Sequence, residues 1–312
     1  MSANYNRNYN NVRIVLFERD NDVRQNLKQT LLQDTFTKTV ATSGMKTVQS
    51  AIFSDQVDLM VVDIDADRKE FQAMMRKIRH HEIGDNPFPI TIALSSDSHF
   101  RNVSQTMNAG FDIMLLKPFS MGTFLDRVHH LIRARSPFVV TADYIGPDRR
   151  LDQRPSARKD LLINVPNPLK IMASGEVTAL RMQNDIKDGI DLVNEHRVVA
   201  NGKKIVELVG ELVSQYMLSD LDLEFIQVMK RLGVVCVEMD KRLRRSKFAH
   251  AAELCDTMGH VVTRMLKSPL APSSKDIELI QNLGQAIDRA FHSDKAEIRA
   301  AHSITDSIRA PA

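Results

Sequence analysis

Short apolar runs alternate with segments of helical periodicity through the first 132 residues, and this alternation restricts the fold more than any other feature of the chain. The apolar runs lie at residues 12–17, 37–41, 59–62, 90–94 and 113–116. In the segment that follows each run, apolar residues recur every three or four positions, as they do on one face of a helix. Strands that alternate with helices form a parallel sheet with helices on both faces. The sequence therefore predicts a five-stranded parallel α/β domain.

Polar side chains follow four of the five predicted strands at the point where each strand ends. They are Glu18, Asp20, Asp63, Ser95 and Lys117. The chemistry of such sheets collects beyond the carboxyl ends of the strands, so we expect these side chains to lie together. A carboxylate in this position can attack phosphorus, while an ammonium and a hydroxyl can bind phosphoryl oxygens. A divalent cation with oxygen ligands would neutralise the phosphoryl charge.

The segments that carry these residues resemble the receiver domains of bacterial two-component response regulators. The matching segments read RIVLFERDNDVRQNLKQTLL, VDLMVVDI, ITIALSS and AGFDIMLLKPF, and the resemblance covers about residues 11–135. It implies a flavodoxin-like sheet with Asp63 as the phosphoacceptor, Ser95 as the switch hydroxyl and Lys117 as the cation that senses the phosphoryl group. It also implies a cis bond between Lys117 and Pro118.

The same resemblance implies a Mg²⁺ ion at the acidic edge of the sheet. Its expected ligands are Glu18, Asp63 and the backbone carbonyl of Asp65, with Asp20 as a further candidate. The family usually places two adjacent acids after the first strand, whereas this chain has Glu18 followed by Arg19. A guanidinium stays charged and cannot ligate a cation. Three arrangements stay open: Asp20 replaces the missing acid, Arg19 points away, or Arg19 pairs with Asp63 in place of the metal.

A second departure concerns the readout of the domain. Met114 stands at the position on the fifth strand where the family usually has an aromatic switch residue, so the usual rotamer readout is not expected. Together with Arg19, this departure keeps a second function open, in which a degenerate receiver acts as a scaffold without phosphorylation.

The domain organisation follows from changes of pattern along the chain. The polar, asparagine-rich residues 1–10 predict a disordered tail, and the receiver-like pattern occupies residues 11–136. Residues 137–173 predict a linker, because they mix both charge signs with turn formers and contain several prolines. Residues 174–308 show only helical periodicity and predict an all-helical output domain.

The helical half carries apolar stripes suited to packing against partner helices. One stripe keeps alternating spacings of four and three through Phe225, Met229, Leu232, Cys236, Met239 and Leu243. Such seams close within a bundle or across a dimer. The two cysteines of the chain, Cys236 and Cys255, both lie in these stripes, which predicts buried apolar roles rather than a disulfide.

A DNA-binding output is the alternative for this half. The densest basic run, Lys241–Lys247, could meet nucleic-acid phosphates. The net charge of only +3 and the frequency of cations near helix C-termini favour a solvated face instead. The histidines of the helical half lack the histidine–lysine–glycine signature of phosphotransfer helices; they are His196, His250, His260, His292 and His302.

These patterns predict a response regulator that accepts a phosphoryl group on Asp63 and signals through helical protein interaction or dimerisation. The expected partners are a sensor histidine kinase or phosphotransfer protein, a downstream protein and a second copy of the chain. No enzymatic activity is expected beyond its own phosphorylation and dephosphorylation. No apolar run approaches the roughly 20 residues of a transmembrane helix, and the N-terminus lacks the apolar core of a signal peptide. We therefore expect a cytoplasmic protein without membrane contact.

Overall fold

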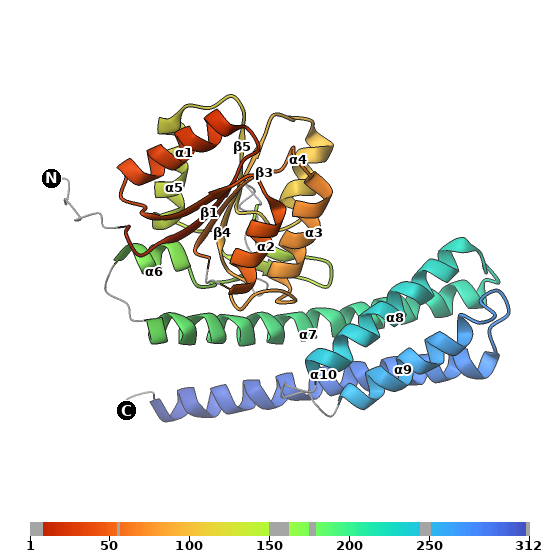
Figure 1. Ribbon diagram of the computed structural model, residues 1–312. Coiled ribbons are helices and arrows are strands. Elements are labelled where there is room, and N and C mark those ends of the chain that lie inside the picture. The colour runs from red at the N-terminus through yellow and green to blue at the C-terminus, as the bar shows by residue number, and fades with distance from the viewer. Residues whose placement is uncertain (1–8, 55–56, 150–161, 175–178, 244–250, 310–312) are drawn as a thin grey trace. The chain divides into compact units, whose positions relative to one another are not determined.

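A five-stranded parallel sheet organises the first half of the protein (Figure 1). The computed structural model describes residues 9–54, 57–149, 162–174, 179–243 and 251–309. The strands pair in the order β2-β1-β3-β4-β5 and all pairs are parallel. They are β1 (Arg13–Phe17), β2 (Lys38–Thr42), β3 (Leu59–Asp63), β4 (Ile90–Ser95) and β5 (Ile113–Leu116). This confirms the α/β sheet predicted from the alternating pattern.

Helices cover both faces of the sheet because successive strand residues point to opposite sides. Ile14 and Leu16 pack with α1 and α5, whereas Val15 and Phe17 pack with α2 and α3. The helices that follow the five strands in turn are α1 (Asn21–Gln33), α2 (Met45–Ser54), α3 (Arg68–Arg79), α4 (Phe100–Met107) and α5 (Met121–Arg133). Because all the strand pairs are parallel, the carboxyl ends of the five strands lie at one edge of the sheet.

The predicted tail, residues 1–10, contains a residue of the core. Residues 1–8 lie outside the described residues, but Tyr9 is buried. Its ring stacks on Phe36 with centroids 4.4 Å apart, and its backbone N–H donates to the Thr35 hydroxyl at 3.1 Å. Tyr9 thus belongs to the core of the α/β domain.

Part of the predicted linker, residues 137–173, forms regular structure instead. It contains the antiparallel strands β6 (Phe138–Val140), β7 (Ile145–Pro147) and β8 (Leu162–Ile163), followed by the helix α6 (Pro168–Ser174). Two of its prolines lie at element ends, where the missing N–H costs little. The strands form because Phe138, Val140 and Ile145 are buried in a shared apolar cluster. Residues 150–161 of the predicted linker lie outside the described residues.

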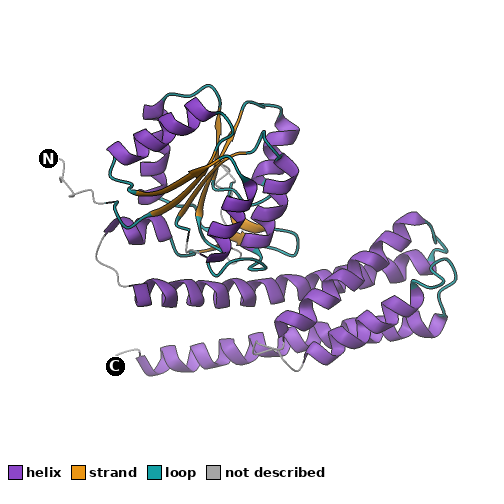
Figure 2. Cartoon of the chain, in the orientation of Figure 1, coloured by secondary structure: helices purple, strands orange, loops and turns teal. Residues whose placement is uncertain are grey.

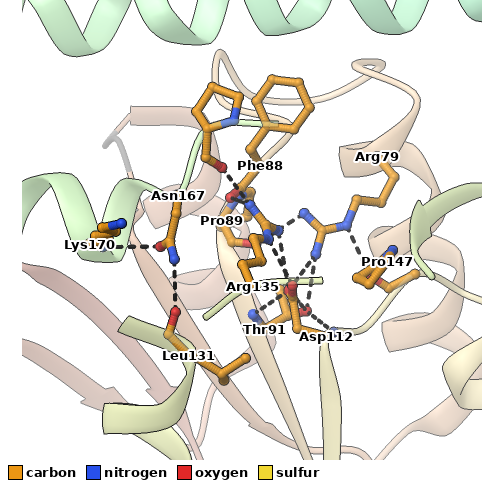
Figure 3. A network of polar contacts seen from close by, with 12 residues as sticks. Arg79, Phe88, Pro89, Thr91, Asp112, Leu131, Arg135, Pro147, Asn167 and Lys170 are labelled. Atoms are coloured by element: carbon orange, nitrogen blue, oxygen red, sulfur yellow. Dashed lines mark hydrogen bonds and ion pairs between the residues drawn. The ribbon is translucent and has the colours of Figure 1, made fainter. Parts of the chain in front are cut away.

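Two arginines with buried side chains, Arg79 and Arg135, connect this extension to the parallel sheet (Figure 3). Asp112 accepts from Arg79 at 2.8 Å and from Arg135 at 2.9 Å. Arg135 also donates to the backbone oxygen of Pro166 at 2.7 Å. Both guanidinium groups lie over the Phe138 ring, with their central carbons 5.1 Å and 4.7 Å from its centroid. The α/β domain and the extension therefore share one buried polar network.

The rest of the described chain is helical, as predicted, and no strand follows β8 in it (Figure 2). The helices are α7 (Ala179–Met217), α8 (Leu223–Leu243), α9 (Ala252–Met265) and α10 (Ser274–Arg309). The chain divides into two compact units between Val193 and Asn194, inside α7, whereas the sequence placed the start of the helical domain at 174. The difference arises because Met182 and Ile186 of α7 pack with the apolar cluster of the extension.

The helical unit is built on the predicted stripes. All six residues of the stripe from Phe225 to Leu243 are buried in its core. Cys236 and Cys255 are buried free thiols, as expected. None of the helices formed by the described residues is long and apolar enough to span a membrane.

Candidate functional site

Two carboxylates and an ammonium meet at the carboxyl edge of the parallel sheet. Asp63 is the last residue of β3, Glu18 directly follows β1, and Lys117 directly follows β5. The Lys117 Nζ lies 2.7 Å from Glu18 Oε2 and 3.2 Å from Asp63 Oδ1. Glu18 and Asp63 are only 1% and 6% exposed. Lys117 and Pro118 are joined by a cis peptide bond, as the sequence predicted.

The electrostatics of this cluster differ from those of three isolated side chains. Burial, followed by the charge of Glu18, raises the pKa of Asp63, and the nearby ammonium of Lys117 opposes that rise. Burial lowers the pKa of Lys117, but the hydrogen bond with Glu18 and the charge of Asp63 outweigh it, so that pKa is raised overall. The lysine therefore stays protonated and holds both carboxylates with one positive charge.

The predicted switch hydroxyl is held by residues of the β3–α3 and β4–α4 loops. Ser95 is fully buried, and its Oγ donates to Asp65 Oδ1 at 2.6 Å. The backbone N–H of Ser96 donates to Asp65 Oδ2 at 2.5 Å. Arg68 forms ion pairs with Asp65 at 2.9 Å and with Asp97 at 2.7 Å. These contacts form a network that we call the Ser95 clamp, made of Asp65, Arg68, Ser95, Ser96 and Asp97.

From the sequence we predict a role only for the backbone carbonyl of Asp65, and none for Arg68 or Asp97. The signal was present in two stretches that contain acids, DIDADR from the last residue of β3 and SSDS from the last residue of β4. Facing loops of a parallel sheet bring such stretches together. Their charges could have indicated an arginine bridge, but not which oxygen would accept from Ser95.

Arg19 and Asp20 do not join the cluster. Arg19 is exposed and pairs with no carboxylate among the residues described, and the cation beside Asp63 is Lys117. The side chain of Asp20 caps α1, accepting from the backbone N–H groups of Asp22 and Val23 at 2.9 Å and 3.1 Å. In this structure Arg19 is thus exposed and does not pair with Asp63, while Asp20 is used as a helix cap. The role of Asp20 as a further metal ligand stays a prediction.

Met114 is partly buried on β5 and packs against the apolar cluster that contains Phe17 and Phe71. A methionine there fills space as a flexible apolar side chain, in place of the aromatic residue expected of the family. The position therefore contributes packing to the α2–α3 face of the sheet.

The acidic edge retains oxygen donors for a divalent cation, though fewer than the family pattern supplies. No three acidic, histidine or cysteine side chains of the described residues come close enough to share an ion. Glu18 and Asp63 remain as a pair held by one lysine. Mg²⁺ commonly takes one or two protein carboxylates and keeps several waters. The pair therefore fits a largely hydrated ion, and the Asp65 carboxylate is already engaged by Ser95 and Ser96.

The basic run Lys241–Lys247 lies mostly outside the described residues, which end at Leu243 before the next segment. Arg242 is described and is engaged within the helical unit. Its Nε lies 3.0 Å from Glu238 Oε1, and its Nη1 donates to Asn194 at 2.6 Å. Glu238 also binds the nearly buried Arg197 at 2.9 Å. Arg242 thus serves an internal ion-pair network.

Comparison with known proteins supports the assignment of the first domain. The chain is 31% identical over 122 residues to the response regulator MprA of Mycobacterium ulcerans (strain Agy99), which covers 39% of this chain and 50% of that protein. It is 30% identical over 126 residues to the response regulator MprA of Mycolicibacterium vanbaalenii, covering 40% of this chain and 52% of that protein. No protein-family model matches the chain.

The chain spans about half the length of these curated relatives, and the matched region corresponds to its N-terminal 40%. That region contains the parallel sheet with strand order β2-β1-β3-β4-β5 and the cluster of Glu18, Asp63 and Lys117 at its carboxyl edge. The N-terminal domain of this protein is a receiver domain of the bacterial response-regulator family.

Proposed function

We propose that the protein is a cytoplasmic response regulator that accepts a phosphoryl group on Asp63 and signals through its helical unit. The observation that carries the proposal is the position of Lys117, whose Nζ lies within 3.2 Å of Asp63 and 2.7 Å of Glu18 at the carboxyl edge of the sheet. The upstream donor would be a sensor histidine kinase or a phosphotransfer protein. A downstream protein or a second copy of the chain would bind the outer face of the helical unit, since its apolar stripes already pack against one another in the core.

The reaction proposed for Asp63 is a phosphoryl transfer. A carboxylate oxygen of Asp63 attacks the phosphorus atom, a new O–P bond forms, and the bond to the donor breaks with its electron pair leaving on the donor. Lys117 remains protonated and places its charge beside the phosphoryl oxygens. Glu18 holds the lysine at this position through the 2.7 Å contact. Positive charge for the transferring group would also come from a Mg²⁺ held by Glu18, Asp63 and the backbone carbonyl of Asp65.

A second function is favoured by one observation, the exposed Arg19 at the position where the family usually has a metal ligand. In this alternative the domain is a scaffold that works without phosphorylation. The ammonium of Lys117 already offsets part of the negative charge of Glu18 and Asp63 without a metal. The receiver would then present one constitutive surface to its partner.

Intact-mass spectrometry separates the two functions. The full chain is incubated with a small acyl phosphate and Mg²⁺, with and without a chelator, alongside Asp63→Asn and the matched control Asp67→Asn. We expect one phosphoryl adduct on the wild type and on Asp67→Asn, and none on Asp63→Asn or with the chelator. Asp67 suits the control because it is exposed in the same loop and asparagine also caps helices well.

If the wild type forms no phosphoryl adduct, the variant Arg19→Asp decides between the two functions. An adduct that forms only on Arg19→Asp would contradict phosphorylation of the natural protein and support the scaffold. An adduct on both proteins, with a lower Mg²⁺ requirement for Arg19→Asp, would support the phosphoryl acceptor and show what the substitution costs.

A further inference from the structure

The hydroxyl group of Ser95 has no hydrogen-bonding capacity left in this structure. A serine hydroxyl offers one donor and two acceptor positions. Ser95 Oγ donates to Asp65 Oδ1 at 2.6 Å. It accepts from the backbone N–H of Asp97 at 3.0 Å and lies 3.4 Å from an Nη2 of Arg68 that can donate to it. Its single proton is therefore committed to Asp65.

Asp65 is well suited to keep that proton. Its two oxygens accept from the Ser95 hydroxyl and the Ser96 N–H, and Arg68 contacts the same carboxylate at 2.9 Å. Burial alone would raise the pKa of Asp65, but the hydrogen bonds from Ser95, Ser96 and Arg68 outweigh it and hold that pKa below its usual value. Hydrogen bonds to an ionised acceptor are the strong ones. Asp65 is thus ionised, and its carboxylate binds both the Ser95 hydroxyl and the Ser96 N–H.

Asp63 lies next to this network on the neighbouring strand. In the parallel pairing of β3 and β4, Asp63 is level with Leu94, one residue before Ser95. The backbone N–H of Asp65 also lies 3.3 Å from Asp63 Oδ1, so the two aspartates occupy one turn. A group added to Asp63 and the carboxylate of Asp65 would therefore compete for the same donors.

We propose that the Asp65 side chain is an internal competitor that holds Ser95 and Ser96 until a phosphoryl group on Asp63 takes them over. The inference rests on the proposed function, since it requires that Asp63 accepts such a group. Because Ser95 has one proton, its bond to Asp65 must break before it can donate to a phosphoryl oxygen. The free energy needed to break the hydrogen bonds from Ser95 and Ser96 to Asp65 therefore reduces the free energy with which the site binds the phosphoryl group. Asp65 acts as a positioning residue through Ser95.

Removing the competitor should strengthen binding of a phosphoryl mimic. A hydrogen bond to a charged group contributes enough net stability that its loss changes an equilibrium about ten- to a hundredfold. We therefore expect Asp65→Ala to bind beryllofluoride, in the presence of Mg²⁺, about ten- to a hundredfold more tightly than the wild type. Asp65→Asn should fall between them, since an amide oxygen can still accept from Ser95 but carries no charge.

The experiment is a titration of the full chain with beryllofluoride, followed by NMR of the Ser96 amide, on wild type, Asp65→Ala, Asp65→Asn and the control Asp67→Asn. Before ligand is added, the hydrogen bond to Asp65 should shift the Ser96 amide proton of the wild type downfield. This shift should be absent in Asp65→Ala. A change of fold would disturb amides throughout the sheet, whereas loss of the clamp moves those of Ser96 and its neighbours.

The outcomes separate the inference from the function beneath it. The order Asp65→Ala, then Asp65→Asn, then wild type, with Asp67→Asn equal to wild type, supports the competitor. Equal affinity of all four proteins overturns it while leaving Asp63 as the phosphoryl acceptor. Failure of every protein, Asp65→Ala included, to bind beryllofluoride and to take up phosphate overturns the proposed function, and the inference with it.

Discussion

The buried carboxylate of Asp112 should decide whether the extension is held to the receiver domain. Asp112 lies directly before β5 and is 2% exposed at its side chain, and the guanidinium groups that bind it are 0% (Arg79) and 4% (Arg135) exposed. It also accepts from Thr91, from the backbone N–H at 2.9 Å and from the hydroxyl at 3.0 Å. The substitution Asp112→Asn keeps the shape and removes the only negative charge in this set.

The expected loss is large because two buried cations would remain without their anion. Breaking a buried ion pair by removing one partner costs about 3–5 kcal/mol. Burial already lowers the pKa of Arg79 to about 10, and the charge of Asp112 opposes that fall while the charge of Arg135 adds to it. Domains are stable by only about 5–15 kcal/mol, so the substitution would remove a large share of the stability of the first unit.

Hydrogen exchange of the full chain, read by mass spectrometry, measures this loss locally. A reduction of about 3 kcal/mol raises the exchange rate of the best protected amides about a hundredfold. We expect this acceleration in peptides from β5, β6 and β7. The matched control is Asp126→Asn on the exposed face of α5, which should change stability by less than about 0.5 kcal/mol.

A second substitution tests whether the unpaired charge is the cause. Replacing Arg135 by methionine in the Asp112→Asn protein removes one of the two uncompensated guanidinium groups. We expect it to restore part of the lost protection, so that the two changes are not additive. If Asp112→Asn exchanges like Asp126→Asn, the network does not stabilise the junction and this reasoning is wrong.

Two further predictions concern other buried polar groups. Burial raises the pKa of Asp58 from 3.8 to about 7, and its Oδ1 has no partner among the described residues. Because the folded state binds this proton more tightly, the associated stability is present below about pH 4 and is lost as the pH rises to about 7, by up to about 4 kcal/mol. Urea unfolding against pH should show that fall in the wild type and not in Asp58→Asn; parallel curves would contradict it. In the helical unit, Asn201 is fully buried and neither its amide oxygen nor its nitrogen has a partner in the described residues. Asn201→Leu should therefore raise the free energy of unfolding by about 1–3 kcal/mol in urea unfolding, and a decrease would indicate a bond that the substitution breaks.

The sequence was sufficient for features that depend on periodicity. Strand β3 was predictable because a run of consecutive apolar residues suits a strand buried on both faces. The stripe from Phe225 to Leu243 was predictable because a spacing of four and three defines one face of a helix. The meeting of Glu18, Asp63 and Lys117 followed from the rule that parallel strands end at a common edge.

The features that escaped prediction depend on contacts between residues far apart in the chain. The strands β6 and β7 have only three residues each, too few for a periodic signal. They are stabilised by Phe138 packing under two arginines whose positions the local sequence does not reveal. Similarly, nothing near Asp65 indicates that its carboxylate accepts from Ser95, 30 residues away.

The two charged networks of the receiver domain are joined by a single short strand. Asp112 lies directly before the four residues of β5 and Lys117 directly after them. Both ends are tied to β4, since the Asp112 N–H donates to the Thr91 oxygen at 3.2 Å and the Lys117 N–H to the Ser95 oxygen at 2.8 Å. The Asp112 end is buried and bonded to two arginines, so sliding β5 as a whole would break several charge-assisted bonds. We therefore expect a change in charge at Asp63 to be accommodated at the Lys117 end and in the Ser95 clamp. The side chains of Lys117, Arg68 and Asp97 are 20–33% exposed there, and each of their ion pairs can break separately.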